Sequence, residues 1–439
     1  MTREFWFALA PDLLVLGLVV VLMLLEILRL DAAWGRAKFV GVLVVALAAL
    51  ALQWDQGYAA TVLEGELRVD RLAILGKAVL LLCGLGVAVG FAGSERGHKF
   101  WILAASSLLG GMVMLGSVGF ATMFLGLELL SMPVFALIVQ GQGRTAAAEG
   151  AFKYLVLSSV ASATFLFGAS LAYGLTGSLA LEPFVGLVHA GGGMQAQAAL
   201  LLVLAGLFLK AAVFPFHAWA PDAYAAARLP VTALMASLVK AAVVLAIVRI
   251  AGPFPLAEAA VLVVTALALV SIAFGNLAAL GQLRFRRLLA YSSVAHAGYM
   301  VFALLDTTGA RASDLLWYTA FYGLAAVLAC ASFAALCPGD DDRLERLDGQ
   351  FARRPVAAAA LALAMLSLAG VPPLPGFFAK LFVFRSVIAS GHTLWATLAF
   401  VGSFLGLAYY LGVALRPFRT GALPAGAPAR AERRDETVA

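Results

Sequence analysis

LFLKAAVFPFHAWAPD at residues 207–222 and LAGVPPLPGFFAKLFVF at residues 368–384 are the two stretches that set the architecture of this chain. Each interrupts a long apolar run with prolines, and each places one lysine beside the interruption, Lys210 or Lys380. Proline removes a backbone donor and clashes with the preceding helical turn. Irregular backbone at membrane depth persists only where protein or a wet cavity receives its polar groups. We therefore expect two discontinuous transmembrane helices.

The whole chain is too apolar for a soluble domain. Hydrophobic residues make up 63% of its 439 residues and charged residues only 12%, whereas soluble domains have about 25% charged residues. The net charge of +6 comes from basic residues in short connections, which argues against a nucleic-acid partner. The three cysteines form no CxxC pair, so neither a metal cluster nor a disulfide framework is predicted. The composition predicts a polytopic membrane protein with no cofactor of its own.

Apolar runs between polar connections predict an all-α, polytopic transmembrane helix bundle. The N-terminus lacks the pattern of a cleaved signal peptide, so we expect the first span to be kept. Thirteen spans are predicted, near residues 11–29, 37–54, 71–92, 100–117, 119–140, 150–175, 197–227, 230–250, 256–281, 285–305, 313–337, 355–390 and 393–415.

Alternate connections differ in their content of positive charge. One set carries most of the arginines and lysines, and by the positive-inside rule this set is cytoplasmic. The N-terminus is then outside, and an odd number of spans places the C-terminal tail in the cytoplasm. That tail, residues 420–439, is rich in Ala, Pro and Arg and is predicted to be disordered. The opposite set of connections holds only Arg3, Arg68, Arg71, Arg249 and Arg311.

The two interrupted spans belong to a repeat. Lys210 and Lys380 are 170 residues apart, and Glu128 and His296 are 168 apart. Both pairs are separated by five spans. Because five is odd, the two units run in opposite directions, which is typical of an inverted-repeat transporter with its site near mid-membrane. The predicted divisions are N-terminal transmembrane helices at 1–99, a first five-helix repeat at 100–250, a second, inverted repeat at 254–416, and the tail at 420–439.

Ionisable residues inside the spans are the candidate site. A charge at the centre of a span costs about 2.5–3.5 kcal/mol, so such residues need partners or water. Glu128, Lys210 and Lys240 lie midway along their apolar runs, beyond easy reach of either interface. Lys380 lies beside the second break, where freed carbonyls would also hold a purely structural ammonium group. We expect these four to carry protons, with structural salt bridges as the alternative.

Three further residues are candidates for which a purely structural role is equally plausible. Lys153 lies about one turn into its span, so snorkelling to the interface competes with function. His296 lies well inside a span, where it relays protons or simply packs through a hydrogen bond. His217 stands between the prolines of the first break and either moves protons or caps freed backbone groups.

Together these residues predict a hydrated proton wire. A neighbouring carboxylate changes how firmly a buried lysine holds its proton, so separating Glu128 from Lys210 would act as an electrostatic switch. Lys240 and His296 would carry the proton sideways, and Lys380 would release it on the opposite side. The waters between them would be held by the hydroxyls of Ser237, Ser292 and Ser293.

Between about residues 100 and 415 the chain resembles the antiporter-like membrane subunits of respiratory complex I and their Mrp-type relatives, and within that family the N-type subunits. The residues before 100 are generic apolar spans. The motifs that carry the resemblance are LGLELLSMPVFAL (125–137), AAAEGAFKYLVLSSVASATFLFG (146–168), FLKAAVFPFHAWAPDAY (208–224), SLVKAAVV (237–244), RRLLAYSSVAHAGYM (286–300) and MLSLAGVPPLPGFFAKLFVF (365–384).

The resemblance implies a subunit without redox centres in the bacterial inner membrane. It would move protons outward as part of an NADH:quinone oxidoreductase, driven by quinone reduction elsewhere in the complex. FMN and iron–sulfur clusters would belong to partner chains, and sister antiporter-like subunits and small membrane subunits would be its neighbours. By matching motif positions, the switch pair is Glu128 and Lys210, the central relay Lys240, the exit residue Lys380, and the supporting members Lys153 and His296.

Two alternatives stay open at this point. Mrp antiporters and membrane-bound hydrogenases share the broken helices and their lysines, so a cation/proton antiporter subunit of such a complex is one. A scaffold subunit that only seals the membrane, with its lysines in structural ion pairs, is the other. One feature departs from the family, because a fourteenth span usually follows the helix that here ends near Arg416.

Overall fold

The structure is a computed structural model that describes residues 3–29, 34–92, 97–141, 143–252, 256 and 258–419. The predicted disordered tail, residues 420–439, and Arg96 of the basic connections lie outside the described residues.

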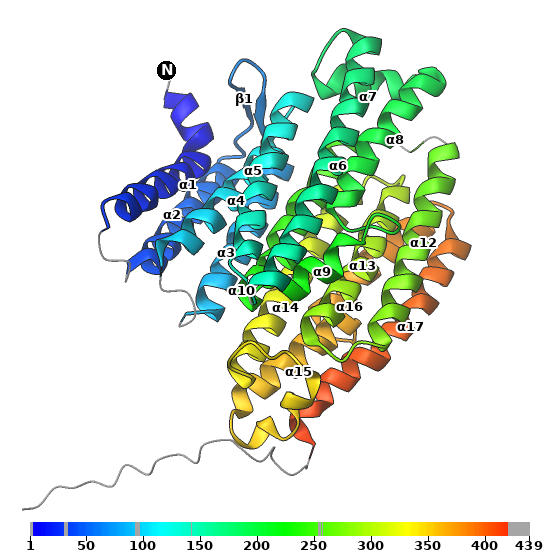
Figure 1. Ribbon diagram of the computed structural model, residues 1–439. Coiled ribbons are helices and arrows are strands. Elements are labelled where there is room, and N and C mark those ends of the chain that lie inside the picture. Colours follow the sequence, from blue (N-terminus) through cyan, green and yellow to red (C-terminus); the bar gives the residue numbers. More distant parts are fainter. Residues whose placement is uncertain are drawn as a thin grey trace, which may run out of the picture.

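The described residues form a bundle of helices, most of which are long enough to cross a membrane (Figure 1). Twelve of them have the length and apolarity of membrane spans, which confirms the predicted all-α transmembrane bundle. The thirteenth predicted span, 355–390, is a pair of shorter helices. The helices are α1 Arg3–Ile27, α2 Gly35–Asp55, α3 Arg71–Gly90, α4 His98–Gly116, α5 Phe120–Val139, α6 Arg144–Thr176, α7 Leu181–His189, α8 Gly193–Lys210, α9 Trp219–Ala226, α10 Leu229–Leu234, α11 Lys240–Ala251, α12 Glu258–Leu280, α13 Phe285–Phe302, α14 Arg311–Leu336, α15 Pro355–Ala369, α16 Pro375–Ala389 and α17 Thr393–Leu415.

Both predicted breaks are present. The first is the irregular segment 211–218 between α8 and α9, and the second is the segment 370–374 between α15 and α16. Gly370 ends α15 with a φ of +87°, a left-handed conformation that favours glycine. The first helix ends at Lys210, five residues before Pro215, and the second ends at Ala369, three residues before Pro372, which confirms the two discontinuous helices.

The helix that carries Lys240 is the most enclosed in the described bundle. It runs from Leu229 to Ala251 through α10 and α11, and its most apolar window is completely buried. A π-helical turn at Met235–Val239 joins its two parts immediately before Lys240. Such turns often occur at functional sites. The sequence predicted a plain span here, because a π-helical turn has no simple local signature.

The helices of the two predicted repeats pack in the same order. Helix α4 packs along α5 in the first repeat, and α12 packs along α13 in the second. The two parts of the first broken helix, α8 and α9, lie on α6. The two parts of the second, α15 and α16, lie on α14 in the same way. Gly110 approaches α5 so closely that an added Cβ would overlap the backbone of Leu130. Gly275 makes the matching approach to Ala295 of α13. This packing supports the inverted repeat, and the residue boundaries of the repeats stay a prediction.

A short antiparallel hairpin between α2 and α3 was not predicted. Its strands are β1 Ala60–Val62 and β2 Leu67–Val69, joined by a turn in which Gly65 has a φ of +98°. Leu67 and Val69 are buried, so the hairpin packs on the bundle through alternate residues of β2. Three-residue strands are too short to show a clear period of two in the sequence.

The basic connections lie at the end of the bundle opposite the sparsely charged ones. Arg68, Arg249 and Arg311 line one cavity at the end where β1 and α7 lie (Figure 1). The connection that precedes α15 lies at the other end of the bundle, where Arg286 pairs with Asp342. The start of α1 and the end of α17 also lie at opposite ends. This arrangement agrees with an odd number of membrane crossings.

Candidate functional site

The first cluster of the site surrounds Lys210, at the end of α8. Lys210 is 4% exposed, and its Nζ atom lies 3.8 Å from Oε1 of Glu128 on α5. It also donates to Oγ of Ser131 at 2.9 Å and to Ser158 of α6. Glu128 in turn accepts a hydrogen bond from Ser162 of α6. The structure therefore brings the predicted switch pair together, and adds three serines that the sequence analysis did not single out.

Lys240 connects the first break to the second repeat. Its Nζ atom donates to the carbonyl oxygen of Ala211 at 3.0 Å and to that of Ser293, on α13, at 2.6 Å. Ala211 directly follows the end of α8, where final carbonyls lack intrahelical partners. Lys240 is buried and forms no ion pair among the described residues. Its amino group is thus held by backbone carbonyls in the described part of the chain.

Lys380 is held in the same manner at the second break. Its Nζ atom donates to the carbonyl oxygen of Ala369, the last residue of α15, at 2.8 Å. It also donates to Oγ of Ser403 on α17 at 2.8 Å and lies 4.9 Å from the centre of the Tyr299 ring. Carbonyls freed by the break do hold this ammonium group, as one of the two sequence interpretations expected. The geometry fits both a structural lysine and a proton carrier.

His296 is close enough to both Lys240 and Lys380 to interact with them electrostatically. Its Nδ1 atom is 2.9 Å from the Tyr318 hydroxyl and its Nε2 atom 3.1 Å from the Tyr410 hydroxyl. A cavity of about 10 Å³ beside the ring is just large enough for one water molecule. Both ring nitrogens therefore have partners that either donate or accept a proton.

Lys153 and His217 lie outside this buried row. Lys153 is paired with Asp222 and with Glu149, each at 2.7 Å, and its side chain is 43% exposed. His217 stacks on Phe214 in the first break, with a distance of 5.3 Å between ring centres. Within the described part of the chain, neither residue makes a hydrogen bond to Lys210, Lys240 or Lys380.

Buried tyrosines are a second part of the site that the sequence analysis missed. Tyr410 is hydrogen-bonded to Ser292 as well as to His296. Asn276 of α12 lies 3.5 Å from the Tyr299 hydroxyl and accepts from that of Tyr409 at 3.0 Å. A hydroxyl donates and accepts at once, so these groups extend the row toward Lys380. The sequence feature that could have predicted them is the presence of tyrosines in the middle of apolar spans.

Lys77, near the start of α3, belongs to a separate ion pair. It is 4% exposed, and its Nζ atom lies 2.6 Å from Oδ2 of Asp12. This pair joins α1 to α3, far along the chain from the broken helices. Its role is best described as structural.

Comparisons with known proteins agree with this geometry. The family described as "NADH:quinone oxidoreductase/Mrp antiporter, TM" matches residues 117–406. NADH-quinone oxidoreductase subunit N of Pelobacter propionicus is 52% identical over 431 residues, which cover 98% of this chain and 93% of that protein. The chain belongs to this family.

Solved structures of both branches of the family share this fold. A chain of respiratory complex I from Thermus thermophilus matches with a TM-score of 0.83 and 36% identity, covering 93% of this chain and 89% of that one. A chain of the Mrp complex from Dietzia sp. DQ12-45-1b shares the fold, with a TM-score of 0.82 at 23% identity over 96% and 81% of the two chains. The predicted complex I membership, of the N type, is confirmed over the Mrp alternative. The chain is a proton-translocating membrane subunit of the NADH:quinone oxidoreductase type.

Proposed function

We propose that protons cross this subunit along the buried row Glu128, Lys210, Lys240, His296 and Lys380. The observation that carries the proposal is the continuity of the row from one broken helix to the other. Lys240 is bonded to the carbonyl of Ala211, next to Lys210, and His296 interacts with both Lys240 and Lys380.

The Glu128–Lys210 pair is the switch in this scheme. At 3.8 Å the two charges attract each other strongly in a site that excludes most water. The hydroxyls of Ser131 and Ser158 hold the ammonium group when the carboxylate moves away. Moving Glu128 therefore changes the protonation of Lys210 without leaving the ammonium group bare.

The second half of the path runs through histidine and tyrosine hydroxyls. A proton leaving Lys240 passes through water to His296, whose ring nitrogens are bonded to Tyr318 and Tyr410. Lys380 then accepts the proton as a neutral amine and becomes an ammonium group. Lys153, with its carboxylate partners, collects protons at the cytoplasmic end of α6, and His217 supports the wet segment of the first break.

The exposed part of the site indicates a neighbouring subunit. The Glu128 side chain is 24% exposed near the middle of a span, and a carboxylate facing lipid there is costly. A sister antiporter-like subunit or a small membrane subunit covers it in the assembled complex.

The protein itself lies in the bacterial inner membrane with its N-terminus outside and its C-terminus in the cytoplasm. FMN and iron–sulfur clusters are held by partner chains, and quinone is reduced elsewhere in the complex.

The test is proton uptake by inverted membrane vesicles that contain the assembled complex with Lys210→Ala. We expect the protons taken up per NADH oxidised to fall clearly below the wild-type value. The control is Lys99→Ala, which removes a lysine whose side chain is 72% exposed. A Lys210→Ala complex that assembles and pumps like the control overturns the proposal.

A further inference from the structure

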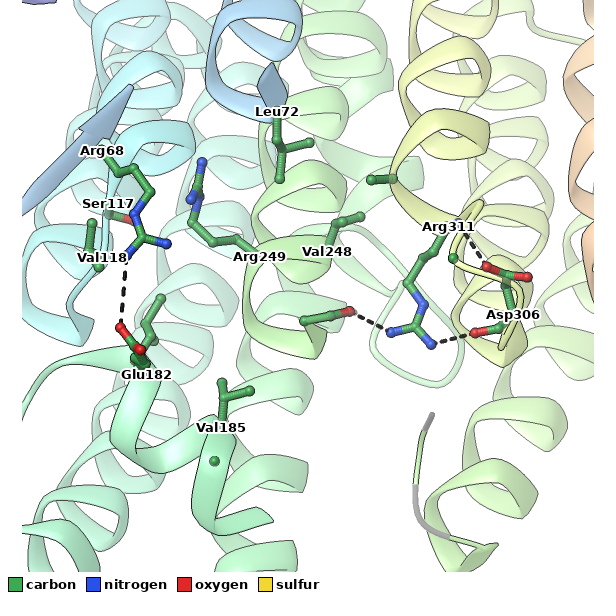
Figure 2. A pocket seen from close by; sticks show the side chains of 15 residues that line it. Arg68, Leu72, Ser117, Val118, Glu182, Val185, Val248, Arg249, Asp306 and Arg311 are labelled. Atoms are coloured by element: carbon green, nitrogen blue, oxygen red, sulfur yellow. Dashed lines mark hydrogen bonds and ion pairs between the residues drawn. The ribbon is translucent and has the colours of Figure 1, made fainter. Parts of the chain in front are cut away.

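A cavity of about 580 Å³ opens at the end of the bundle that the proposed orientation places outside (Figure 2). Its walls come from both predicted repeats, with Val248 of α11 on one side and Asp306 and Arg311, at the start of α14, on the other. Arg311 donates to the carbonyls of Gly252 at 2.9 Å and of Asp306 at 2.7 Å. At about 30 Å³ for each water, the cavity has room for many water molecules. The cavity reaches the start of the second repeat at Asp306, Gly309, Arg311 and Ala312.

Asp306, on the wall of this cavity, is a structural carboxylate. It accepts hydrogen bonds from the backbone and hydroxyl of Thr308, at 3.0 and 2.6 Å, and from the amide of Arg311 at 2.8 Å. Burial alone would raise the pKa of Asp306, but these hydrogen bonds hold the pKa below its usual value. Asp306 therefore stays ionised and does not carry a proton.

Asp314, one turn deeper on α14, has a different environment. It is 4% exposed, and its Oδ2 atom is buried without a hydrogen-bond partner in the described part of the chain. Ser386 and Arg385 of α16, and Asp306, are close enough to interact with it electrostatically. A carboxylate in the first turn of a helix is favoured by the helix dipole, but the dipole does not require that an oxygen be buried without a partner. A buried, incompletely bonded carboxylate requires another explanation.

The position of Asp314 joins the proposed path to the cavity. On α14 it lies one helical turn from Tyr318, whose hydroxyl is 2.9 Å from His296. On α16 its neighbour Ser386 follows Lys380 by six residues, which is about 9 Å along a helix. On the other side its neighbour is Asp306, which lines the cavity. Asp314 is thus placed between the last lysine of the row and the water outside.

We propose that Asp314 is the outlet carboxylate of the proton path, an inference that rests on the proposed function. The Lys380 ammonium group gives its proton through water to the Asp314 carboxylate, which leaves a neutral amine and a neutral carboxylic acid. The acid then releases the proton to water in the cavity, and the carboxylate is restored. Arg68, Arg249 and Arg311, which line the cavity, keep it polar and hydrated.

The experiment compares Asp314→Asn, Asp314→Glu and Lys210→Ala in the assembled complex in inverted vesicles. We expect Asp314→Asn to lower proton uptake per NADH oxidised to the level of Lys210→Ala, and Asp314→Glu to restore most of it. Asp306→Asn is the control for a structural carboxylate. We expect it to lower thermal stability without changing the proton uptake per NADH oxidised. Normal uptake by Asp314→Asn beside impaired uptake by Lys210→Ala overturns the outlet alone. Normal uptake by both overturns the proposed function.

A second measurement covers the case in which Asp314→Asn does not assemble. Infrared difference spectra of wild type and Asp314→Glu during turnover should contain a carboxylic acid band that shifts between the two proteins, because the residue at position 314 becomes protonated. A purely structural carboxylate would give no such shift, and that result overturns the outlet.

Discussion

The ammonium group of Lys240 donates a hydrogen bond of 3.0 Å to the carbonyl oxygen of Ala211, the residue directly after Lys210. Lys380 makes the equivalent bond of 2.8 Å to Ala369, the last residue before the second break. A helix that ends inside a membrane leaves carbonyls without intrahelical partners, and in both repeats a lysine supplies the donor. The geometry of each break and the protonation of a lysine are therefore coupled.

Replacing Lys240 with methionine tests this coupling. The Lys240→Met variant removes the donor for the carbonyls of Ala211 and Ser293, which costs about 1–3 kcal/mol of stability. We expect the complex to assemble and proton uptake per NADH to fall. Uptake and assembly are measured together in inverted vesicles, with Lys99→Met as the matched surface variant. Full uptake by Lys240→Met would favour a scaffold subunit.

The switch pair should behave as a unit. Glu128→Gln keeps the shape of the side chain and removes its charge, so we expect proton uptake to fall by about tenfold or more. The double variant Glu128→Gln/Lys210→Met should be no worse than the single variants, because residues that act together are not additive. Independent, multiplying losses would show that the two residues work separately. Ser162→Ala, which removes the hydrogen bond to Glu128, should have a smaller effect.

The Asp12–Lys77 pair should affect stability rather than transport. Lys77→Met leaves a buried aspartate without its partner, which we expect to cost about 3–5 kcal/mol. The double variant Asp12→Leu/Lys77→Met should recover most of this loss, because no charge is left unpaired. Thermal unfolding in detergent provides the measurement. A double variant as unstable as the single one would contradict the structural assignment.

The crossing of α4 and α5 should not tolerate a side chain at Gly110. A Cβ there would overlap the backbone of Leu130, and forcing atoms into a packed contact costs about 1–3 kcal/mol or more. Gly174→Ala on α6, where a Cβ meets nothing within 4 Å, is the matched control. Thermal unfolding should show a large loss for Gly110→Ala and almost none for Gly174→Ala.

Asp70 should make stability depend on acid pH. Burial raises the pKa of Asp70, but two hydrogen bonds of 3.0 Å from Arg249 lower it below the usual value. A lowered pKa in the folded state gives stability that is fully present above the unfolded pKa of about 3.9 and is lost as the pH falls through the folded value. Asp70 also caps α3, because its Oδ1 atom accepts from the amide of Ala73 at 2.8 Å. Asp70→Asn keeps a good helix cap but lacks the charge. The stability difference between wild type and variant should therefore shrink between pH 6 and about pH 3, and a constant difference would contradict the role of this ion pair.

Local features were sufficient to predict the spans, the two breaks and most of the buried row. Apolar length predicts a membrane helix because the bilayer core is about 30 Å thick, and proline interrupts a helix wherever it stands. A lysine or glutamate far from either interface is recognisable for the same reason. None of these inferences requires knowledge of which helices touch.

The partners of those residues were decided only when the helices packed. Ser131, Ser158 and the carbonyl of Ala211 are ordinary in the sequence, and they become ligands of Lys210 and Lys240 because three or more helices bring them within hydrogen-bonding distance. The tyrosines around His296 and the position of Asp314 between that row and the outer cavity have the same origin. Hydrogen bonds act over about 3 Å, so a proton path is a property of packed helices and not of the order of residues along one of them.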